Sequence, residues 1–300
     1  MIRKVFKGKQ NALRVKEPME LMTFLGIHFN GKSRSDLKFM LSHKQVCVNG
    51  APVLRFDHPL LEGDTITFTT GKVEHELRHP KLKIMYEDDY LIVVEKEEGL
   101  LSVATGMGRE ETTAFSLLAD YQKEKNPRNR LFIVHRIDRE TSGVMMFVKT
   151  REAQEVLRDN WNESVTERVY IAVVEGAPKR TEDTVVSYLH EDRSFRVHSN
   201  QKDDGRGKEA ITHYRVIRQN DRYAMLKVEL DTGRKNQIRV HMQDIGHPIV
   251  GDLKYGASSS PIGRIGLHAQ VLAFVHPITK EILRFETPIP KKFNALFDRK

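Results

Sequence analysis

The stretch V-H-R-I-D-R-E-T-S-G-V-M-M-F-V-K, residues 134–149, joins a charged loop to an apolar segment and decides how the rest of the chain is interpreted. Within it, Asp138 lies between Arg136 and Arg139, directly before the β-prone run 144–148. Nearby positive charges favour the ionised form of a carboxyl group, so we expect the pKa of Asp138 to be lowered. An ionised aspartate at the end of a strand suits covalent carboxylate catalysis. The alternative is a purely structural ion-pair network, in which perturbed carboxylates also occur.

The length and composition describe a soluble chain. With 300 residues, 39% of them hydrophobic, it can form one large domain or two unequal ones around a sizeable core. No apolar run approaches the roughly 18 residues of a membrane-spanning helix, and the basic N-terminus lacks the apolar stretch of a signal peptide. Cys47 is the only cysteine, which excludes an internal disulfide and a cysteine-based zinc site. We therefore expect a cytoplasmic protein.

The positive charge is concentrated at the start of the chain. The whole sequence carries a net charge of +8, and residues 1–79 hold thirteen Lys or Arg against eight Asp or Glu, a net +5. A basic segment of this kind is compatible with a polyanionic partner such as RNA.

A polar segment separates two regions of different character. Residues 71–80, G-K-V-E-H-E-L-R-H-P, are charged and end in proline, which is typical of an interdomain linker. We therefore divide the chain into a first domain of residues 1–75, a linker of residues 76–81 and a second domain of residues 82–300.

The first domain reads as two helices followed by a small sheet. Residues 18–28 have apolar side chains at near-helical spacing, and a second helix is expected from a cap at Ser33 to about His43. Residues 46–53, V-C-V-N-G-A-P-V, place two short β-prone runs around Asn-Gly, a strong hairpin signal. Residues 60–68 read as a turn and a further strand.

This order of elements resembles the alpha-L RNA-binding motif first recognised in a ribosomal small-subunit protein, and residues 33–50 carry the resemblance. It implies RNA contact by Arg34, Lys38, Lys44 and Asn49, of which the three cations lie mostly away from the apolar side of the helix. The alternative is that these residues only solvate a helix face.

The second domain is dominated by strand-like segments that do not alternate regularly with helices. The expected strands are residues 91–94, 144–148, 169–174, 224–230 and 237–242, and the main expected helices are residues 113–125 and 152–160. This pattern predicts an α+β fold with a mixed or antiparallel sheet, as opposed to a doubly wound nucleotide-binding fold.

Several kinds of chemistry have no signature here. The sequence contains no dinucleotide fingerprint, phosphate loop or G-x-S-x-G elbow, and no pair of histidines has H-E-x-x-H spacing. His241 and His247 are isolated from other possible ligands, so we expect core or hydrogen-bonding roles for them and no metal. No cofactor is expected, and the remaining chemistry is that of Asp, Tyr and Arg side chains.

The second domain resembles the RluA family of RNA pseudouridine synthases. Four blocks in order carry the resemblance: I-M-Y-E-D-D-Y-L-I-V-V-E-K-E-E-G-L-L-S-V (84–103), the opening stretch 134–149, D-T-G-R-K-N-Q-I-R-V-H-M-Q-D-I-G-H-P-I-V-G-D-L-K-Y-G (231–256), and the segment 267–290 with L-H-A-Q-V-L-A-F-V-H-P and F-E-T-P-I-P. The resemblance implies a pseudouridine synthase catalytic domain, and many members carry an alpha-L domain before it.

The resemblance also implies roles for individual residues. Asp138 matches the catalytic aspartate, and Tyr170 matches a tyrosine that packs on the target base and could transfer a proton. Arg239 matches the arginine that pairs with the catalytic carboxylate, and Arg136 an arginine that fills the space left by the extruded base. The alternatives are a core aromatic for Tyr170 and an ordinary cation on a strand surface for Arg239.

Two places depart from the family pattern. The family usually has Lys-Pro-Ala-Gly where this chain has Lys-Glu-Glu-Gly at 96–99, and Gly-Arg-Thr-His-Gln where it has Gly-Arg-Lys-Asn-Gln at 233–237. The second departure puts the local hydrogen bonding of the site in question.

The expected function is isomerisation of uridine to pseudouridine, an isomerase reaction that needs no cofactor. We expect a monomeric RNA-binding enzyme that contacts no membrane, with large-subunit ribosomal RNA as the first candidate substrate and transfer RNA as the second. One rival is a non-catalytic RNA-binding or ribosome-assembly protein. The other is a glycosidase-like hydrolase, which needs a second carboxylate that is not evident beside Asp138.

Overall fold

The computed structural model divides the chain into two compact units, Ile2–Glu76 and a second unit from Leu77 onward. It describes residues 2–6, 9–42, 44–70, 73–104 and 111–298. Within these ranges, no helix is both long enough and apolar enough to cross a lipid bilayer.

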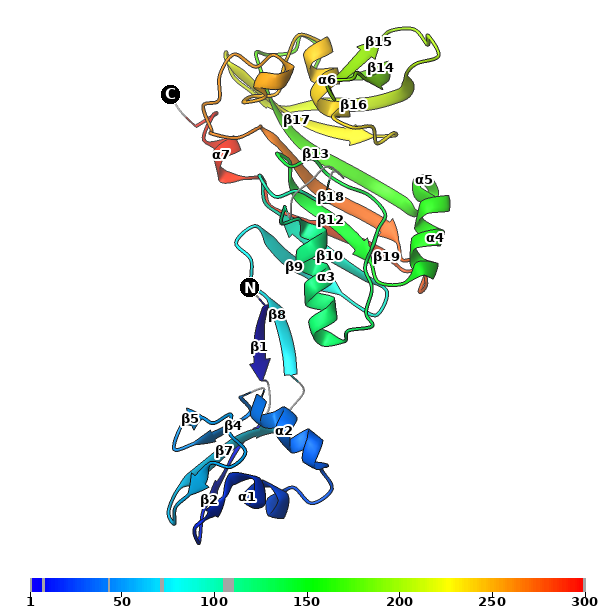
Figure 1. Cartoon of the computed structure of the whole chain (residues 1–300). Coiled ribbons are helices and arrows are strands. Elements are labelled where there is room, and N and C mark those ends of the chain that lie inside the picture. The colour runs from blue at the N-terminus through cyan, green and yellow to red at the C-terminus, as the bar shows by residue number, and fades with distance from the viewer. Residues whose placement is uncertain (1, 7–8, 43, 71–72, 105–110, 299–300) are drawn as a thin grey trace. The chain divides into compact units, whose positions relative to one another are not determined.

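The first unit contains two helices and several short strands (Figure 1). Its strands form a sheet of order β2-β7-β4-β5 and the separate pairs β3-β6 and β1-β8. The elements are β1 (Ile2–Phe6), β2 (Lys9–Arg14), β3 (Met19–Glu20), α1 (Leu21–His28), α2 (Arg34–Ser42), β4 (Val46–Val48), β5 (Ala51–Pro52), β6 (Pro59–Leu60), β7 (Thr65–Thr70) and β8 (Val73–Leu77).

Local sequence explains this arrangement. Ser33 caps α2, because its hydroxyl accepts the backbone N–H of Asp36 at 3.2 Å while the Asp36 carboxylate accepts the N–H of Ser33. The Asn-Gly hairpin between β4 and β5 is confirmed, with positive φ at both Asn49 and Gly50. His43, where the second helix was expected to end, lies outside the described residues.

The expected linker is partly a strand. Residues 71–80 read as an interdomain linker, but Val73–Leu77 within them form the strand β8, which pairs with β1. The backbone N–H and C=O groups of any segment can hydrogen-bond to those of a neighbouring strand. A polar segment can therefore form a strand although its side chains show no alternating pattern.

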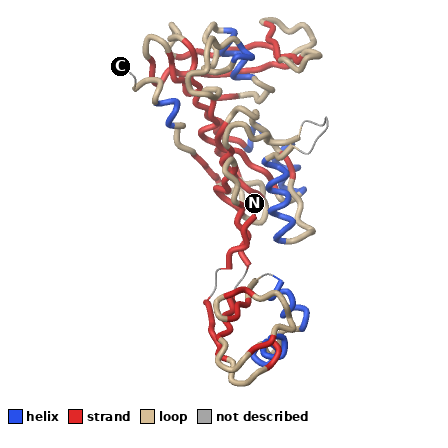
Figure 2. Tube along the Cα trace, turned by 60° about the vertical axis from the view of Figure 1, so that its left-hand side comes forward, coloured by secondary structure: helices blue, strands red, loops and turns tan. Residues whose placement is uncertain are grey.

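The second unit is built on one large sheet, whose strands run through it in Figure 2 with helices on its flanks. The sheet has eleven strands in the order β15-β14-β16-β17-β13-β18-β12-β10-β9, with β11 added to β12 and β19 added to β18. The elements are β9 (Leu82–Glu87), β10 (Leu91–Lys96), α3 (Ala114–Lys125), β11 (Phe132–Ile133), β12 (Ser142–Val148), α4 (Arg151–Asp159), α5 (Trp161–Ser164), β13 (Val165–Glu175), β14 (Glu182–Glu191), β15 (Val197–Asn200), β16 (Lys208–Gln219), β17 (Tyr223–Leu230), α6 (Gln237–Asp244), the 3₁₀ helix η1 (Leu253–Tyr255), β18 (Leu267–Val275), β19 (Ile282–Glu286) and α7 (Lys291–Asn294).

The sheet is mixed, as expected. The β12–β18 pair is parallel and all the others along the path are antiparallel. The parallel contact is limited to Ser142 and Gly143 against His268 and Ala269. Gly143 has a φ of +118°, and a Cβ there would lie 2.0 Å from the carbonyl oxygen of Ala269, so only glycine allows the two strands to approach at this point.

Helices pack on the sheet at different places along it. Helix α4 packs near β11 and β12, and α6 packs on β15 and β16. The apolar side chains of α6, Ile238 and Met242, enter a core with those of β13 and β17, among them Val174 and Leu226. This packing fixes α6 against strands β13 to β17 of the sheet.

Candidate active site

Asp138 lies in the loop between β11 and β12, and this loop is anchored on both sides. The His135 Nε2 atom accepts the backbone N–H of Met146 at 2.9 Å, and the Ser102 hydroxyl donates to the carbonyl of Ile137 at 2.6 Å. The carbonyl of Asp138 itself accepts the N–H of Thr141 at 3.2 Å. Hydrogen bonds therefore hold the loop that carries the carboxylate, shortly before the buried strand β12.

Arg239 does not lie on a strand. Residues 237–242 were expected to be a strand, but they form most of helix α6. The alternation of Ile238, Val240 and Met242 matched a strand period, yet every residue from Gln237 to Met242 is buried, and a short segment buried all round shows no helical periodicity. The interpretation of Arg239 as a surface cation is therefore also wrong, because its side chain is only 6% exposed.

Arg239 is held by a carboxylate that sequence reasoning missed. Its Nε and Nη2 atoms donate to the two carboxylate oxygens of Asp252, at 2.6 and 2.9 Å. This bidentate pair fixes the plane of the guanidinium. The remaining Nη1 atom lies 3.6 Å from Asp138 Oδ2 and 3.4 Å from Glu140 Oε2. The sequence contained a signal for Asp252, because this residue belongs to the block 231–256 that carries the family resemblance.

The left-handed residue before α6 adds a second support. Asn236 has a φ of +55° and donates its side-chain amide to the hydroxyl of Tyr255 at 2.9 Å. Its amide oxygen accepts Nη1 of Arg239 at 3.4 Å, and the Arg239 guanidinium lies over the Tyr255 ring at 5.1 Å. The departure from the family pattern at this position therefore yields a complete hydrogen-bonding arrangement.

The protonation equilibrium of Asp138 differs from the expectation. Burial raises the pKa of the Asp138 carboxyl above its ordinary value, and the attraction of Arg239 only partly opposes this. Glu140 adds to the rise and Arg136 counters it. The expected lowering was wrong because Arg239 is shared with Asp252, so that removal from water outweighs the neighbouring positive charge.

Tyr170 lies on β13 and contributes to the same pocket as Asp138. Tyr170 is partly buried and packs against the core beneath α6. The alternative role as a core aromatic therefore holds only in part. Burial raises the pKa of Tyr170 to about 12, Arg168 opposes this rise, and the negative charge of Asp138 adds to it. The phenol is therefore neutral at physiological pH.

One pocket brings together the four residues expected in the second unit. Its lining includes Arg136, Asp138, Tyr170 and Arg239, of which Arg136 is the exposed one. The other lining residues come from the loop before β12, from α6 and the loop before it, and from strands β17 and β18: Ile137, Thr141, Leu230, Gly233, Arg234, Asn236, Gln237, Ile238 and Leu267. The pocket combines a half-buried carboxylate, a fixed guanidinium and an aromatic ring.

The histidines take the hydrogen-bonding roles that were expected. His241 lies between the hydroxyls of Ser187 and Thr212, at 2.9 and 2.8 Å, and burial lowers its pKa to about 4. His247 bonds to the carbonyl of Glu175 at 2.9 Å. Across the described ranges, no three His, Cys, Asp or Glu side chains are grouped as they would be around a metal ion.

The four residues expected to contact RNA in the first unit are exposed, but they differ in their contacts. Lys38 lies over the ring of Phe56 at 5.2 Å, and Arg34 and Lys44 have exposed side chains. Asn49 instead joins its hairpin to the loop before β7, since its amide donates to Asp64 and accepts the N–H of Thr65, both at 2.9 Å.

Comparison with known proteins gives a consistent result. Residues 90–244, just over half of the chain, match the family described as RNA pseudouridylate synthase. An uncharacterised RNA pseudouridine synthase of Bacillus subtilis, YhcT, is 32% identical over 269 residues, which cover 88% of this chain and 88% of that protein. Ribosomal large subunit pseudouridine synthase D of Nitrosomonas europaea is 34% identical over 283 residues, covering 88% and 79% of the two chains. The solved structure of human RNA pseudouridylate synthase domain containing 4 is similar in fold, with a TM-score of 0.57 and 21% identity over 70% of this chain and 90% of that one.

Proposed function

The chain belongs to the RNA pseudouridine synthase family, whose members are isomerases, and from this premise we propose that it modifies large-subunit ribosomal RNA with Asp138 as the nucleophile. The observation that carries the proposal is the single pocket in which Asp138, Tyr170 and Arg239 meet. The substrate class is supported by relatives named for the large ribosomal subunit, such as the Nitrosomonas protein.

The chemistry needs only groups that the pocket contains. In the reaction the bond between the ribose C1′ and N1 of uracil breaks, a bond from C1′ to C5 forms, and the proton lost from C5 is balanced by one gained at N1. The ionised Asp138 forms a transient bond to the sugar or to the base while the glycosidic bond is broken. Nothing is added or removed overall, so no carried reagent is required.

Arg239 has a positioning and charge-balancing role. Two of its nitrogens are held by Asp252, which leaves Nη1 directed toward Asp138 and Glu140. The guanidinium can therefore stabilise the Asp138 carboxylate as water is displaced by the substrate, when its attraction becomes stronger.

Tyr170 and Arg136 act on the extruded nucleotide. A base inside a helix or stack must be flipped out to react, at a cost of a few kcal/mol. Stacking of the base on the Tyr170 ring offsets this cost by about 1–3 kcal/mol. The neutral phenol can also take part in proton transfer. Arg136 is exposed at the pocket and can occupy the space left by the base.

The first unit supplies affinity. We infer that it is an alpha-L type RNA-binding domain and that Arg34, Lys38 and Lys44 neutralise phosphates, as the basic start of the chain suggests. Such contacts hold the RNA without reading its sequence.

A map of pseudouridines in a strain that lacks this protein tests the function and the substrate together. We expect one or more large-subunit ribosomal RNA positions to lose the modification and to regain it when the wild-type gene is returned. The Asp138→Asn gene should not restore it, whereas Asp159→Asn, a change of an exposed aspartate on α4, should.

The other outcomes separate the rivals. Loss confined to transfer RNA would replace the substrate proposal. A complete set of pseudouridines in the deletion strain would favour a non-catalytic RNA-binding protein. Free uracil released from RNA by the purified protein would indicate a hydrolase, for which Glu140, beside Asp138 on the same arginine nitrogen, would be the second carboxylate.

A further inference from the structure

The loop between β14 and β15 holds a phenylalanine in an unusual backbone conformation. The loop is closed by two backbone bonds, from Asp192 N–H to the Arg196 carbonyl at 2.9 Å and from Phe195 N–H to the Asp192 carbonyl at 3.0 Å. Phe195 has a φ of +62°, in the left-handed region. Hairpin loops of this length normally place glycine at their left-handed position, because a side chain there is strained. A residue that breaks this local rule calls for a functional explanation.

The rest of the loop holds Phe195 in place. One carboxylate oxygen of Asp192 accepts the N–H and the hydroxyl of Ser194 and the N–H of Arg196, at 2.7–3.0 Å. The other carboxylate oxygen bonds to His198 at 2.8 Å. Because the loop is ordered by these bonds, the Phe195 ring is not needed as packing, and Phe195 remains 63% exposed.

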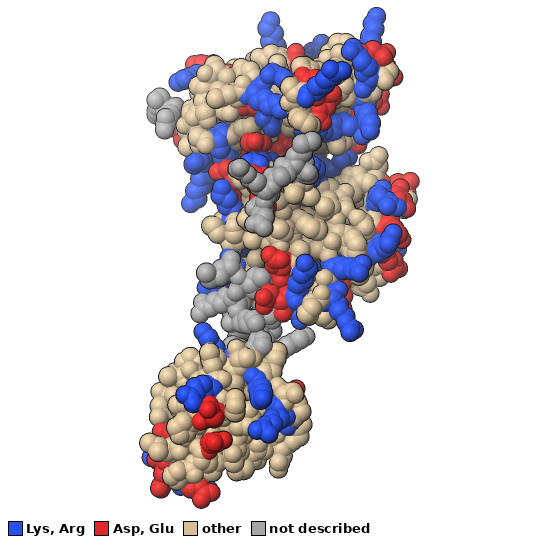
Figure 3. Space-filling view, viewed as in Figure 1, with Lys and Arg blue, Asp and Glu red and all other residues tan. Residues whose placement is uncertain are grey.

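Two lysines flank this phenylalanine. The Lys235 ammonium lies 5.6 Å from the centroid of the Phe195 ring, and Lys254 donates to the Phe195 carbonyl at 3.2 Å. Figure 3 shows further Lys and Arg side chains projecting from the part of the second unit that carries β14, β15 and α6. An exposed aromatic ring among cations is the arrangement that binds single-stranded nucleic acid, since bases stack on the ring while phosphates meet the cations.

The loop is connected rigidly to the pocket. Tyr255, which is fully buried, accepts the N–H of Val197 at 3.1 Å and the side-chain amide of Asn236 at 2.9 Å. Asn236 in turn contacts Arg239, and Lys235 lies between two pocket-lining residues in the sequence. The backbone of the loop that carries Phe195 is therefore tied, through Tyr255 and Asn236, to the guanidinium that faces Asp138.

We propose that Phe195 is a stacking platform for an unpaired RNA base next to the target uridine, with Lys235 and Lys254 contacting the adjoining phosphates. The proposal rests on the proposed function of the neighbouring pocket. The Lys235 ammonium also pairs with the Glu191 carboxylate, with which an RNA phosphate would compete, while among the described residues Lys254 has no such carboxylate partner. The two ammonium groups therefore favour a polyanion that carries bases over an apolar protein surface. The platform holds the strand beside the flipped nucleotide, so its contribution belongs to substrate binding and not to the chemical step.

The test compares Phe195→Gly with Phe195→Trp in the full-length protein. The substrate is RNA tritiated at C5 of uridine, prepared from a strain that lacks the protein, and release of label to water is measured at several RNA concentrations. Phe195→Gly removes the ring and suits the left-handed backbone, so we expect an unchanged or higher Tm, a KM raised about 5- to 100-fold, and a kcat within about twofold of wild type. Phe195→Trp keeps a stacking surface and should hold KM within about threefold.

Controls separate this proposal from the function on which it rests. Ile282→Ala, which removes another exposed apolar side chain from the distant β19, should change neither KM nor kcat. Failure of the wild-type protein to release any label would count against the proposed function. Active wild-type enzyme with an unchanged KM in Phe195→Gly would overturn the platform alone and assign the ring to a protein contact. A KM raised equally in Phe195→Trp would also overturn it.

Discussion

At the scale of single residues, Asp138 lies in the pocket with a carboxyl whose charged form is disfavoured. Its carboxyl is half-buried beside a guanidinium that is already shared with Asp252, and the net effect is a raised pKa. Asp138 was predicted from the sequence, and it does line the pocket. The predicted direction of its pKa shift was wrong, because the arginines beside it are visible in the sequence and the removal of its carboxyl from water is not. A charge that is destabilised in the free enzyme is suited to form a bond when substrate arrives.

A first prediction follows for Asp138→Asn. A carboxyl whose pKa is higher in the folded than in the unfolded state favours folding less as the pH rises through these pKa values. At pH 7 the amide removes this unfavourable ionisation, so the variant should have a Tm higher by a few degrees while losing activity. Differential scanning calorimetry at pH 7 and near pH 4 measures it, and the advantage should shrink at the lower pH. A lower Tm for the variant at pH 7 would contradict the stated balance of charge and burial.

Asp252 gives a second prediction at the same scale. Asp252→Asn removes the carboxylate that orients Arg239, and a misplacement of about 1 Å at a reacting group can lower the rate about 100-fold. We expect a kcat reduced by roughly that factor with a smaller change in KM. Asp244→Asn, at the C-terminal end of α6, is the control and should retain activity. Equal kcat values for the two variants would show that Asp252 does not position the arginine.

At the level of elements, α6 marks the limit of periodicity arguments. Strands such as 144–148 and 169–174 were predicted correctly because long β-prone runs lie in them, and helices 113–125 and 152–160 because their caps and apolar spacing agree. The strand predicted at residues 237–242 was wrong, because a helix that is buried on every side has no polar face from which its period could be recognised. The pocket was still predicted, because the residue identities in the quoted blocks did not depend on that assignment.

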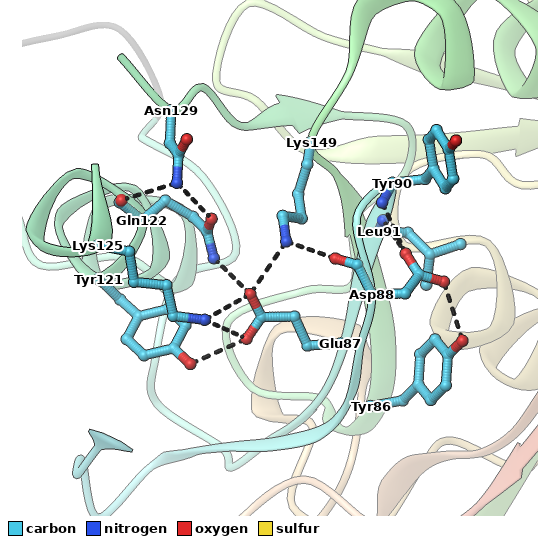
Figure 4. Close-up of polar contacts among 10 residues, drawn as sticks. All are labelled: Tyr86, Glu87, Asp88, Tyr90, Leu91, Tyr121, Gln122, Lys125, Asn129 and Lys149. Atoms are coloured by element: carbon cyan, nitrogen blue, oxygen red, sulfur yellow. Dashed lines mark hydrogen bonds and ion pairs between the residues drawn. The ribbon is translucent and has the colours of Figure 1, made fainter. Parts of the chain in front are cut away.

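A second element is held by an ionic cluster that the sequence did not reveal. Figure 4 shows Glu87, at the end of β9, receiving hydrogen bonds from α3 and from Lys149. The α3 donors are Tyr121 at 2.9 Å, Gln122 at 2.8 Å and Lys125 at 2.7 Å. Burial alone would raise the pKa of Glu87, but these donors prevail and lower it to about 2. The cluster fastens α3 to the ends of β9 and β12.

A third prediction concerns this cluster. A carboxyl with a lowered pKa in the folded state stabilises the fold above its unfolded pKa near 4.5, and this contribution is lost as the pH falls toward 2. Glu87→Gln should therefore lower the free energy of unfolding by about 2–3 kcal/mol at pH 7 and by progressively less below pH 4.5. Urea titration followed by the fluorescence of Trp161, the only tryptophan, measures the change.

The matched control is Glu155→Gln, which breaks an exposed pair with Arg151 at 3.1 Å. It should change the free energy of unfolding by less than about 0.5 kcal/mol, as exposed pairs usually do. A loss of equal size in the two variants, or a loss in Glu87→Gln that does not depend on pH, would refute the role given to the cluster.

For the whole molecule, most of the net positive charge and the pocket belong to different units. The sequence placed most of the net positive charge in its first quarter, and the pocket is formed by the second unit. Composition could indicate this division, but it could not show that residues 73–77 form a strand, because the pairing depends on the distant β1.

A fourth prediction tests the first unit in the full-length chain. If Arg34, Lys38 and Lys44 each neutralise one phosphate, replacing all three with Gln should reduce the slope of log affinity against log salt by about 2–3. Filter binding at several salt concentrations measures that slope. Arg55→Gln is the control, because Arg55 is already paired with Asp57 at 2.9 Å and should leave the slope unchanged. A slope unaffected by the triple change would remove the first unit from RNA binding.

The most direct test of the account is tritium release from C5-labelled RNA by the purified wild-type protein and by Asp138→Asn. The account predicts release to water by the wild-type protein and none above background by the variant, although the variant is folded and binds the same RNA. Release by Asp138→Asn at the wild-type rate would show that this carboxylate is not the nucleophile.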